Sequence, residues 1–437
     1  MNGAPVIVIV GGGFAGLSAA RALRNTPARV FLIDRTNHHL FQPLLYQVAI
    51  AVLSPGQIAS PLRAIFQKQK NITVLLAEVV GVDKEKKLIF ASDADRERVL
   101  HQYDYLILAT GATHSYFGHN EFEKYAPGLK NLADAEAVRN KVLQAFEQAE
   151  AEEDPHAHRD LLTFVLVGGG PAGVEMAGAI AVLVSRSLRT QFRRIDPTSA
   201  RIVLIDRSKK LLKSYADDLS QGAKERLEKM GVEVRLGQGV DEIDADGVVV
   251  AGERIPSKTV IWTAGVAPSP AGAWLNVETD HAGRVRIQPD LTVPGHPEIF
   301  VVGDTASLDH NGEPLEGVAQ VAIQEGRYAG VTIHRRITGK PAPAPFRYFD
   351  KGTMAVVGLG YAVLQSGKLR VKGPMAWIAW GLVHILSLAQ PGLRISVFSQ
   401  WIWTYLTRQG GDRLIVNHHE INRAERTSDV DGRTARA

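Results

Sequence analysis

The chain of 437 residues contains no cysteine. This absence excludes disulfide bridges, metal sites built from thiolates, and every redox mechanism that runs through a pair of cysteines. The N-terminus also lacks a basic stretch before its first apolar run, and that run ends at three glycines after Val10. We therefore expect no secretory signal peptide.

A large excess of charge is missing as well, because 50 Lys and Arg face 46 Asp and Glu, which leaves a net charge of +4. So small an excess gives little reason to expect a nucleic-acid partner, although the basic residues become denser toward the C-terminus. Hydrophobic residues make up 45% of the chain. This length and composition are enough for two or three globular domains with well-buried cores.

The first sixteen residues carry the clearest motif. The apolar, β-branched run Pro5–Val10 predicts a buried strand, and Leu17–Leu23 predicts a helix. Between them lies a G-x-G-x-x-G loop, made of Gly11, Gly12, Gly13, Phe14, Ala15 and Gly16. Such a loop, placed between strand and helix, lets a pyrophosphate approach the backbone at the helix N-terminus.

A carboxylate completes this unit. The run Arg29–Ile33 predicts a second strand, and it ends at Asp34, which could accept hydrogen bonds from a ribose. An ordinary strand–turn–helix could also contain glycines. It would rarely place strand, glycines, helix, second strand and acid in this register, so we predict a dinucleotide site.

The same motif of strand, glycine loop, helix, second strand and acid occurs a second time. The strand predicted at Phe164–Val167 is followed by Gly168, Gly169, Gly170 and Gly173, and the strand at Arg201–Ile205 ends at Asp206. The interval from Gly173 to Asp206 exceeds the roughly 20 residues usual for the motif. We predict that a basic helical extension, Ser185–Arg194, accounts for the excess. The chain is thus predicted to hold two dinucleotide-binding units.

Further along, a strand at Ile299–Val302 ends in Gly303-Asp304, and a helix is predicted from Gln320 to Thr338. An acid at a strand end beside the first unit could hold the ribityl hydroxyls of a flavin.

The C-terminal part is apolar and aromatic. The stretch Gly373–Leu393 has no formally charged residue and approaches a membrane-spanning length, but glycine, histidine, glutamine and proline interrupt it. The next stretch, Ile395–Thr407, puts most of its apolar residues on one helical face: Val397, Phe398, Trp401, Ile402, Tyr405 and Leu406.

Basic residues flank this region at Arg394, Arg408 and Arg413. An aromatic face with basic flanks favours helices that lie on an anionic membrane surface, anchored by Trp377, Trp380, Phe398, Trp401 and Trp403. A dimer interface, or a helix packed on the core, is the alternative interpretation.

Together these residues resemble the type II NADH dehydrogenases, the single-subunit flavoproteins that pass electrons from NADH to a respiratory quinone. The resemblance extends from Val6 to about Ile415. Its most specific parts are the run His39–Ala49, the triplet Gly173-Val174-Glu175, the run Ala319–Gln324, and the stretch from Ala376-Trp377 through Trp403–Leu406.

The resemblance implies an α/β fold with two Rossmann-like domains, for FAD and NADH, and a C-terminal amphipathic helical membrane-binding segment. The FAD domain would be discontinuous, formed by residues 1–111 and 266–340, with the NADH domain inserted at 112–265. Residues 341–416 would bind the membrane, and 417–437 would form a disordered tail.

It also implies residue roles. FAD would be held by Gly11 to Gly16, Asp34, Arg35, His39, Val79, Asp304 and the backbone near Ala322. NADH would be held by Gly168 to Gly173, Asp206 and Gly265. Glu175 matches the catalytic glutamate, although its position in the first turn of a helix would also suit a partner of the helix dipole. Gln320 and Gln324 match the quinone-site motif, and no metal is implied.

The implied partners are a membrane quinone, an anionic bilayer and a second copy of the chain, with the protein peripheral on the cytoplasmic face of the inner membrane. Two departures stand out. The family more often shows Glu where this chain has Asp206, followed here by Arg207, and Gln390-Pro391 interrupts the membrane-binding segment. A soluble reductase of a protein acceptor and a non-catalytic NADH-binding flavoprotein are the alternative functions.

Overall fold

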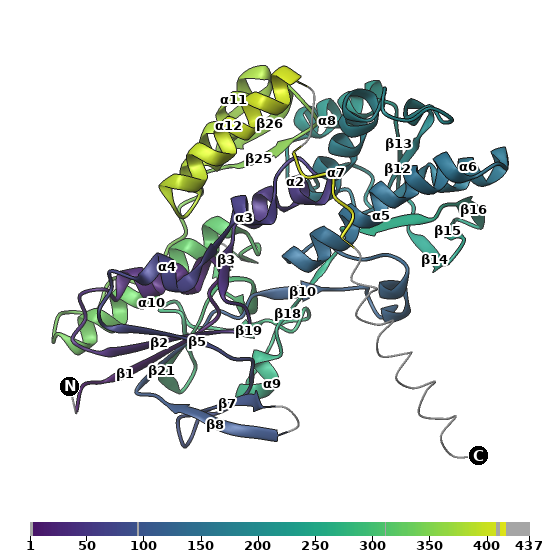
Figure 1. Ribbon diagram of the computed structural model, residues 1–437. Helices are drawn as coiled ribbons and strands as arrows, with labels where there is room; N and C mark the ends of the chain where they lie inside the picture. The colour runs from purple at the N-terminus through teal and green to yellow at the C-terminus, as the bar shows by residue number, and fades with distance from the viewer. Residues whose placement is uncertain (1–2, 94–95, 311, 408–410, 417–437) are drawn as a thin grey trace, which may run out of the picture.

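The protein has two mainly parallel β-sheets, one in each of two lobes, in the computed structural model shown in Figure 1. The structure describes residues 3–93, 96–310, 312–407 and 411–416. The predicted tail at 417–437 and the flanking Arg408 lie outside these residues. The observed α/β architecture confirms the predicted fold class, and each lobe contains one of the two glycine loops.

The first sheet has six strands, in the order β20 (Thr292–Val293), β21 (His296–Val301), β9 (Tyr105–Leu108), β1 (Val6–Val10), β2 (Arg29–Asp34) and β5 (Ile72–Leu76). β1 lies between β2 and β9 and is parallel to both. Its apolar run is buried because neighbouring strands and helices cover it on every side. β21 joins this sheet beside β9, although almost two hundred residues separate the two strands in the sequence.

Two helices pack closely on this sheet: α1 (Phe14–Ala22) and α10 (Ala319–Ile337). Small residues line their contact. A Cβ atom added to Gly326 would lie 2.0 Å from the carbonyl oxygen of Ala15, and one added to Gly330 would lie 2.7 Å from that of Ala19. A larger residue at either position would therefore push the N-terminus of α10 away from the first glycine loop.

The second sheet has four parallel strands, in the order β13 (Val232–Leu236), β12 (Arg201–Asp206), β11 (Thr163–Val167) and β17 (Thr259–Trp262). The helices of this lobe are α5 (Leu132–Ala151), α6 (Pro155–Leu161), α7 (Pro171–Val182) and α8 (Asp217–Lys229). An antiparallel sheet of β14 (Val240–Asp244), β15 (Gly247–Val250) and β16 (Glu253–Pro256) lies beside it.

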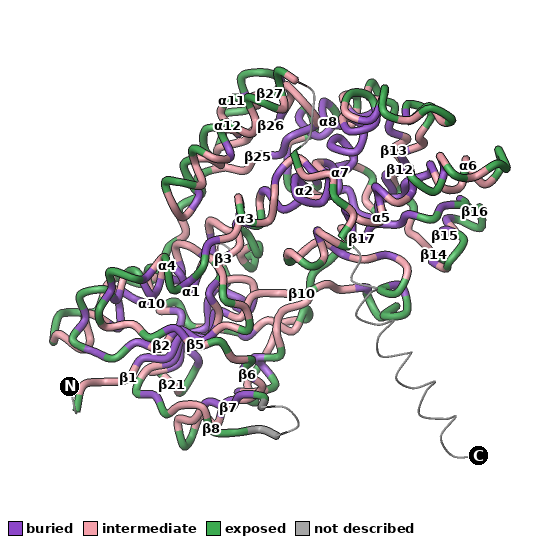
Figure 2. Tube along the Cα trace, viewed as in Figure 1, coloured by how far each residue is buried: buried purple, intermediate pink, exposed green. Residues whose placement is uncertain are grey.

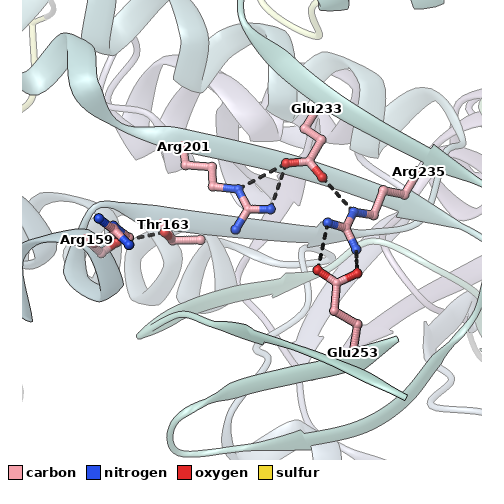
Figure 3. Close-up of polar contacts among 6 residues, drawn as sticks. All are labelled: Arg159, Thr163, Arg201, Glu233, Arg235 and Glu253. Carbon is pink, nitrogen blue, oxygen red and sulfur yellow. Dashed lines mark hydrogen bonds and ion pairs between the residues drawn. The ribbon is translucent and has the colours of Figure 1, made fainter. Parts of the chain in front are cut away.

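A chain of ion pairs joins these two sheets (Figure 3). Arg201 of β12 donates to Glu233 of β13 at 2.8 and 3.0 Å, Arg235 donates to the other oxygen of Glu233 at 2.6 Å, and Arg235 also reaches Glu253 of β16 at 2.9 Å. Partial burial opposes ionisation of Glu233, but the hydrogen bonds from the two arginines outweigh it and lower the pKa of this carboxyl. The network fixes β16 against the edge of the four-stranded sheet.

The predicted helical extension at Ser185–Arg194 is wrong. α7 ends at Val182 and continues only as a short π-helical turn, Leu183–Ser187. Beyond it, the carboxylate of Glu150 accepts hydrogen bonds from the backbone N–H groups of Arg193, Arg194 and Ile195, at 2.8 to 3.1 Å. These N–H groups are therefore held by a side chain rather than by a helix.

Two short strands connect the lobes. β10 (Ala112–His114) and β18 (Val266–Pro268) pair as an antiparallel ribbon, where the chain leaves the first lobe and where it returns. The remaining short elements are β3 (His38–Leu40), α2 (Leu45–Ala49), α3 (Pro55–Ile58), β4 (Ala59–Pro61), α4 (Leu62–Phe66), β6 (Val79–Asp83), β7 (Leu88–Asp93), β8 (Arg96–Gln102), α9 (Ala271–Leu275), β19 (Val285–Arg286), β22 (Ala306–Ser307), β23 (Asp309–His310) and β24 (Glu313–Pro314).

The C-terminal part forms a three-stranded antiparallel sheet and a helical hairpin. The strands are β25 (Thr353–Val356), β26 (Ala362–Ser366) and β27 (Leu369–Gly373), and the helices are α11 (Pro374–Ser387) and α12 (Pro391–Thr407). The hairpin runs past α3 toward α4 (Figure 1), and Gln57 of α3 donates to the hydroxyl of Ser396 of α12 at 2.9 Å. In the described part of the chain, no helix is both long and apolar enough to cross a bilayer.

The hairpin has an inner and an outer face. Trp380, only 3% exposed, stacks on Trp401, with 5.5 Å between ring centres, and Val397 is fully buried beside them. The prediction that Trp380 and Trp401 anchor a membrane is therefore wrong, because both rings pack against the protein core. The outer face carries the exposed apolar residues (Figure 2), namely Met375, Ile378, Leu382, Leu386, Ile395, Phe398, Ile402, Trp403, Tyr405 and Leu406.

Candidate functional site

The first glycine loop is closed toward the sheet and open on its other side. Gly11 has a φ of +104°, and a Cβ atom there would lie 2.2 Å from the carbonyl oxygen of Ala109, so only glycine fits. A Cβ atom added to Gly13, in contrast, would meet nothing within 4 Å. A pyrophosphate could therefore approach the backbone at Gly13 and the N-terminus of α1. This geometry fits the dinucleotide predicted from the sequence.

The carboxylate of Asp34 is held against this loop. One oxygen accepts the backbone N–H of Gly12 at 2.5 Å, and the other accepts the N–H and hydroxyl of Thr36 at 2.6 and 2.7 Å. Ala77 donates its N–H to the Asp34 carbonyl at 2.9 Å, which brings the segment leading to the buried Val79 beside the acid. The side chain of Arg35 is exposed next to it. The carboxylate is thus fixed where a ribose bound at the loop would need it.

The second glycine loop repeats this construction in detail. Gly168 has a φ of +119°, and a Cβ atom added to Gly170 would meet nothing within 4 Å. Asp206 accepts the backbone N–H groups of Gly169 and Ser208, each at 2.5 Å. The two predicted nucleotide loops therefore present the same open side and the same fixed acid.

An exposed aromatic ring lies against the turn that follows β17. Gly265, with a φ of +76°, lies against the ring of Phe117, and a Cβ atom there would come within 2.4 Å of that ring. The guanidinium of Arg207 lies 6.0 Å from the same ring centre. The Arg207 side chain is thus directed toward Phe117, and Gly265 is required for the close approach of the ring.

His39 supports the first loop from behind. Its ring Nδ1 lies 3.0 Å from the carbonyl oxygen of Gly12, and its edge meets the ring of Phe14 at 5.2 Å between centres. Burial lowers the pKa of His39, so the ring is neutral at physiological pH. Its place is that of a positioning residue for the glycine loop.

Three residues that were predicted to hold the flavin, Ala15, Asp304 and Ala322, lie close to Gly303. A Cβ atom on Gly303 would lie 3.4 Å from that of Ala322 and 3.5 Å from that of Ala15. The adjacent Asp304 lies 3.7 Å from the ammonium group of Lys130. The β21 turn, the N-terminal part of α10 and the start of α1 therefore converge on one place.

Glu325, which was not predicted from the sequence, joins α10 to the turn after β21. Its carboxyl is 1% exposed and accepts the N–H of Gly303 at 2.6 Å. Burial raises the pKa of Glu325 to about 8, against the effect of that hydrogen bond. The only sequence signal was its place beside Gly326, one residue beyond the Ala319–Gln324 motif.

Glu175 is the fifth residue of α7, so the prediction that it lies in the first turn of the helix is wrong, and its side chain is half-buried. The backbone N–H of Val356 in β25 donates to its carboxyl at 3.3 Å. Burial raises the pKa of Glu175 to about 8, so the carboxyl can hold a proton at neutral pH. A neutral carboxyl gains little from the helix dipole. The geometry thus favours acid–base chemistry for Glu175 over a role as a dipole partner.

The structure separates the two glutamines of the predicted quinone motif. Both lie in the first turns of α10, but the amide of Gln324 is engaged, since it donates to the carbonyl of Phe349 at 2.9 Å and accepts its N–H at 3.0 Å. The amide oxygen of Gln320, in contrast, is buried without a hydrogen-bond partner in the described part of the chain. A buried polar atom of this kind needs a partner, which a ligand can supply.

A chain of hydrogen bonds connects α2 with α12. The buried hydroxyl of Tyr46 accepts a hydrogen bond from the amide of Gln47 at 2.9 Å. Gln47 in turn accepts the indole N–H of Trp401 at 2.7 Å. Tyr46 and Gln47 belong to the run His39–Ala49 that carries the family resemblance, but no individual role was predicted for either residue.

Comparison with known proteins agrees with this architecture. The family model described as pyridine nucleotide-disulphide oxidoreductase matches residues 5–326. Because the chain contains no cysteine, the disulphide chemistry in that family's name does not apply to it.

Two relatives from Mycobacterium tuberculosis match nearly the whole chain. The type II NADH:quinone oxidoreductase Ndh is 42% identical over 99% of this chain and 96% of its own length. The type II NADH:quinone oxidoreductase NdhA is 44% identical over 94% of this chain and 89% of its own length.

Among solved structures, NDH2 from Plasmodium falciparum in complex with NADH shares the fold, with a TM-score of 0.84. The two are 21% identical, and the match covers 94% of this chain and all of that one. With its two matched nucleotide loops and these relatives, the chain belongs to the pyridine nucleotide-disulphide oxidoreductase family and, within it, to the type II NADH:quinone oxidoreductases.

Proposed function

We propose that the protein oxidises NADH and reduces a membrane quinone to the quinol, without pumping protons. Two electrons pass from NADH to the quinone, and the products are NAD⁺ and a quinol that has gained two protons. The observation that carries the proposal is the pair of glycine loops, each with an acid fixed by backbone N–H groups. The relatives' activity, present in proteins that align over nearly the full chain, supports it.

The first lobe would hold FAD, which supplies the hydride acceptor and the two-electron donor. Gly11 to Gly16 would face its pyrophosphate, Asp34 its ribose, and Asp304 its ribityl chain, with Ala322 near the ring. This assignment makes residues 1–111 and 266–340 one discontinuous domain. The pairing of β21 with β9, and the ribbon of β10 and β18, support that division.

The second lobe, residues 112–265, would hold NADH. Gly168 to Gly173 would face the pyrophosphate, and Asp206 would accept hydrogen bonds from the adenine ribose. A phosphate at the 2′-position would be repelled by this carboxylate, which favours NADH over NADPH. Arg207 reduces this preference little if its guanidinium keeps its place over Phe117, 6.0 Å from the ring centre.

Gln320 and Glu175 would serve the quinone and its protons. The amide of Gln320 could donate to a quinone carbonyl and accept from a quinol hydroxyl, which would satisfy its unpartnered oxygen. Glu175, protonated at neutral pH, could release a proton toward the reacting groups. Gln324 would act by holding the segment at Phe349 in place.

The outer face of α11 and α12 would lie on an anionic membrane, on the cytoplasmic side of the inner membrane. Its exposed apolar residues would enter the boundary between headgroups and acyl chains, which would keep the protein peripheral. Homodimerisation stays a prediction from the family resemblance, and sedimentation velocity in detergent would test it.

The test is a pair of anaerobic half-reactions with the FAD-loaded protein. Stoichiometric NADH should bleach the flavin absorbance, and a short-chain quinone should then restore it within the time of one turnover. Bleaching without restoration by any quinone would contradict the proposal, and would favour a protein acceptor or a non-catalytic flavoprotein.

A further inference from the structure

We propose that a basic cavity at the turn between α11 and α12 binds the phosphate of an anionic lipid headgroup. The inference rests on the proposed membrane location and adds a defined site to it. The cavity has a volume of about 610 Å³. On one side it is lined by Arg21 and Arg24, at the end of α1, and by the segment after α4 that contains Lys68; on the other side lie Ala389 to Gly392 of the turn.

The charges around this cavity have one sign. Arg21, Arg24 and Lys68 are the charged residues that line it, and no acidic residue does. Within the described ranges, these three side chains make no hydrogen bond or ion pair. Burial and the nearby Arg394 both lower the pKa of Arg21, which reflects a positive charge without an acidic neighbour. An anion would relieve the repulsion among these groups.

The turn adds to the positive potential. Pro391 and Gly392, the first residues of the 17-residue helix α12, line the cavity, and no acid lies in the first turn of that helix. The free N–H groups and the positive dipole end at this terminus favour a negative charge. Arg394 is held beside them, because its guanidinium donates to the carbonyl of Leu388 at 3.0 and 3.2 Å.

The surroundings favour a lipid over a soluble phosphate. Leu386, 57% exposed, precedes the turn, and Ile395, 71% exposed, follows it. Both belong to the outer apolar face of the hairpin. A basic cavity that borders an apolar face matches an amphiphile, whose phosphate would enter the cavity while its acyl chains remain beside the helices.

The test compares the full-length, FAD-loaded protein with a variant that carries Arg21→Gln and Arg24→Gln. A matched control carries Arg186→Gln and Arg189→Gln, which removes two exposed arginines of the other lobe. Binding to phosphatidylcholine vesicles, with and without phosphatidylglycerol, is measured by flotation at constant ionic strength. A third arm titrates inorganic phosphate and follows it by calorimetry.

We expect the cavity variant to lose about 25-fold in affinity for phosphatidylglycerol vesicles, since a basic residue at an anionic surface contributes about fivefold. The control should lose much less, and binding to pure phosphatidylcholine should be unchanged in both. Equal losses in the two variants, or no loss in the cavity variant, would overturn the site. It would also be overturned if inorganic phosphate bound the intact protein tightly and only that binding were lost in the cavity variant.

Failure of the site and failure of the proposed function can be told apart. Neither arginine belongs to the proposed catalytic machinery, so the cavity variant should keep its activity with NADH and a water-soluble quinone in detergent. If the intact protein itself lacks that activity, the proposed function fails, whatever the vesicles show.

Discussion

Replacing Glu175 with glutamine should make the folded protein more stable at neutral and alkaline pH. The carboxyl accepts the backbone N–H of Val356 at 3.3 Å, and burial raises its pKa from 4.5 to about 8. At pH 7 such a group is about 90% protonated in the folded protein, whereas in the unfolded chain it is ionised. Ionisation of Glu175 therefore costs the folded protein stability that the unfolded chain does not lose.

The sign and size of the effect follow from this difference. Because the folded pKa lies above the unfolded one, the stability linked to Glu175 is fully present below about pH 4.5 and declines as the pH rises toward 8. Each pKa unit corresponds to about 1.4 kcal/mol, so the decline amounts to roughly 3 kcal/mol at pH 7. Glutamine has nearly the same shape and does not titrate, so the variant escapes this decline.

The assay is urea unfolding of the two FAD-saturated proteins at pH 5 and pH 8, followed by tryptophan fluorescence. The free energies of unfolding of wild type and Glu175→Gln should differ little at pH 5, and the variant should be clearly more stable at pH 8. The control Glu153→Gln, which changes an exposed acid near the end of α5, should follow the wild type at both pH values. A gap for Glu175→Gln that does not widen with pH would show that the carboxyl is ionised in the folded protein.

The same substitution should impair catalysis. Quinone reduction consumes protons, and an amide cannot deliver one, so the rate of flavin reoxidation should fall by about a hundredfold or more. In the wild type this rate should decrease above about pH 8, where Glu175 loses its proton. The variant should lack that pH dependence. A variant with the wild-type pH profile would refute the assignment of Glu175 as an acid.

Three further predictions concern other parts of the molecule. Asp206→Ala should narrow the ratio of kcat/KM for NADH over NADPH, mainly through KM, and equal values for the two nucleotides in the wild type would contradict the role of this carboxylate. Gln320→Leu should slow flavin reoxidation by quinone and spare its reduction by NADH. Gln324→Leu, which breaks two hydrogen bonds to the backbone, should instead lower the free energy of unfolding by about 1–2 kcal/mol. An equal loss of rate in both half-reactions for Gln320→Leu, or an unchanged unfolding midpoint for Gln324→Leu, would refute the separation of the two glutamines' roles. Phe398→Ser combined with Ile402→Ser should weaken binding to phosphatidylcholine vesicles by about tenfold or more, because both side chains are exposed on the outer face of α12. Unchanged binding would exclude this face as the membrane contact.

The sequence alone determined the two nucleotide units. In each unit a buried strand, a glycine loop, a helix and an acid at the next strand end follow one another along the chain, and the acid hydrogen-bonds back to the glycine loop. Gly11 and Gly168 could be recognised because their backbone conformation admits almost no other residue. The run His39–Ala49 and the triplet ending in Glu175 then indicated the family.

Which groups are free and which are engaged depends on contacts between segments far apart in the sequence. Gln320 and Gln324 have the same chemistry and lie one turn apart, but the backbone of Phe349 hydrogen-bonds the amide of Gln324, whereas the amide oxygen of Gln320 has no partner in the described part of the chain. Likewise, the buried carboxyl of Glu325 is explained by the N–H of Gly303, and no local pattern connects these two residues.

In the C-terminal hairpin, too, the burial of individual side chains could not be predicted from the sequence. Its aromatic residues are visible in the sequence, but Trp380 and Trp401 face inward because Gln47 of a distant helix accepts the indole N–H of Trp401 and the core covers Trp380. Arg21, similarly, became part of a basic cavity only because the α11–α12 turn lies against the end of α1. Local sequence fixes which conformations a segment prefers, whereas burial and pairing depend on what packs against it, and that is set by the whole chain.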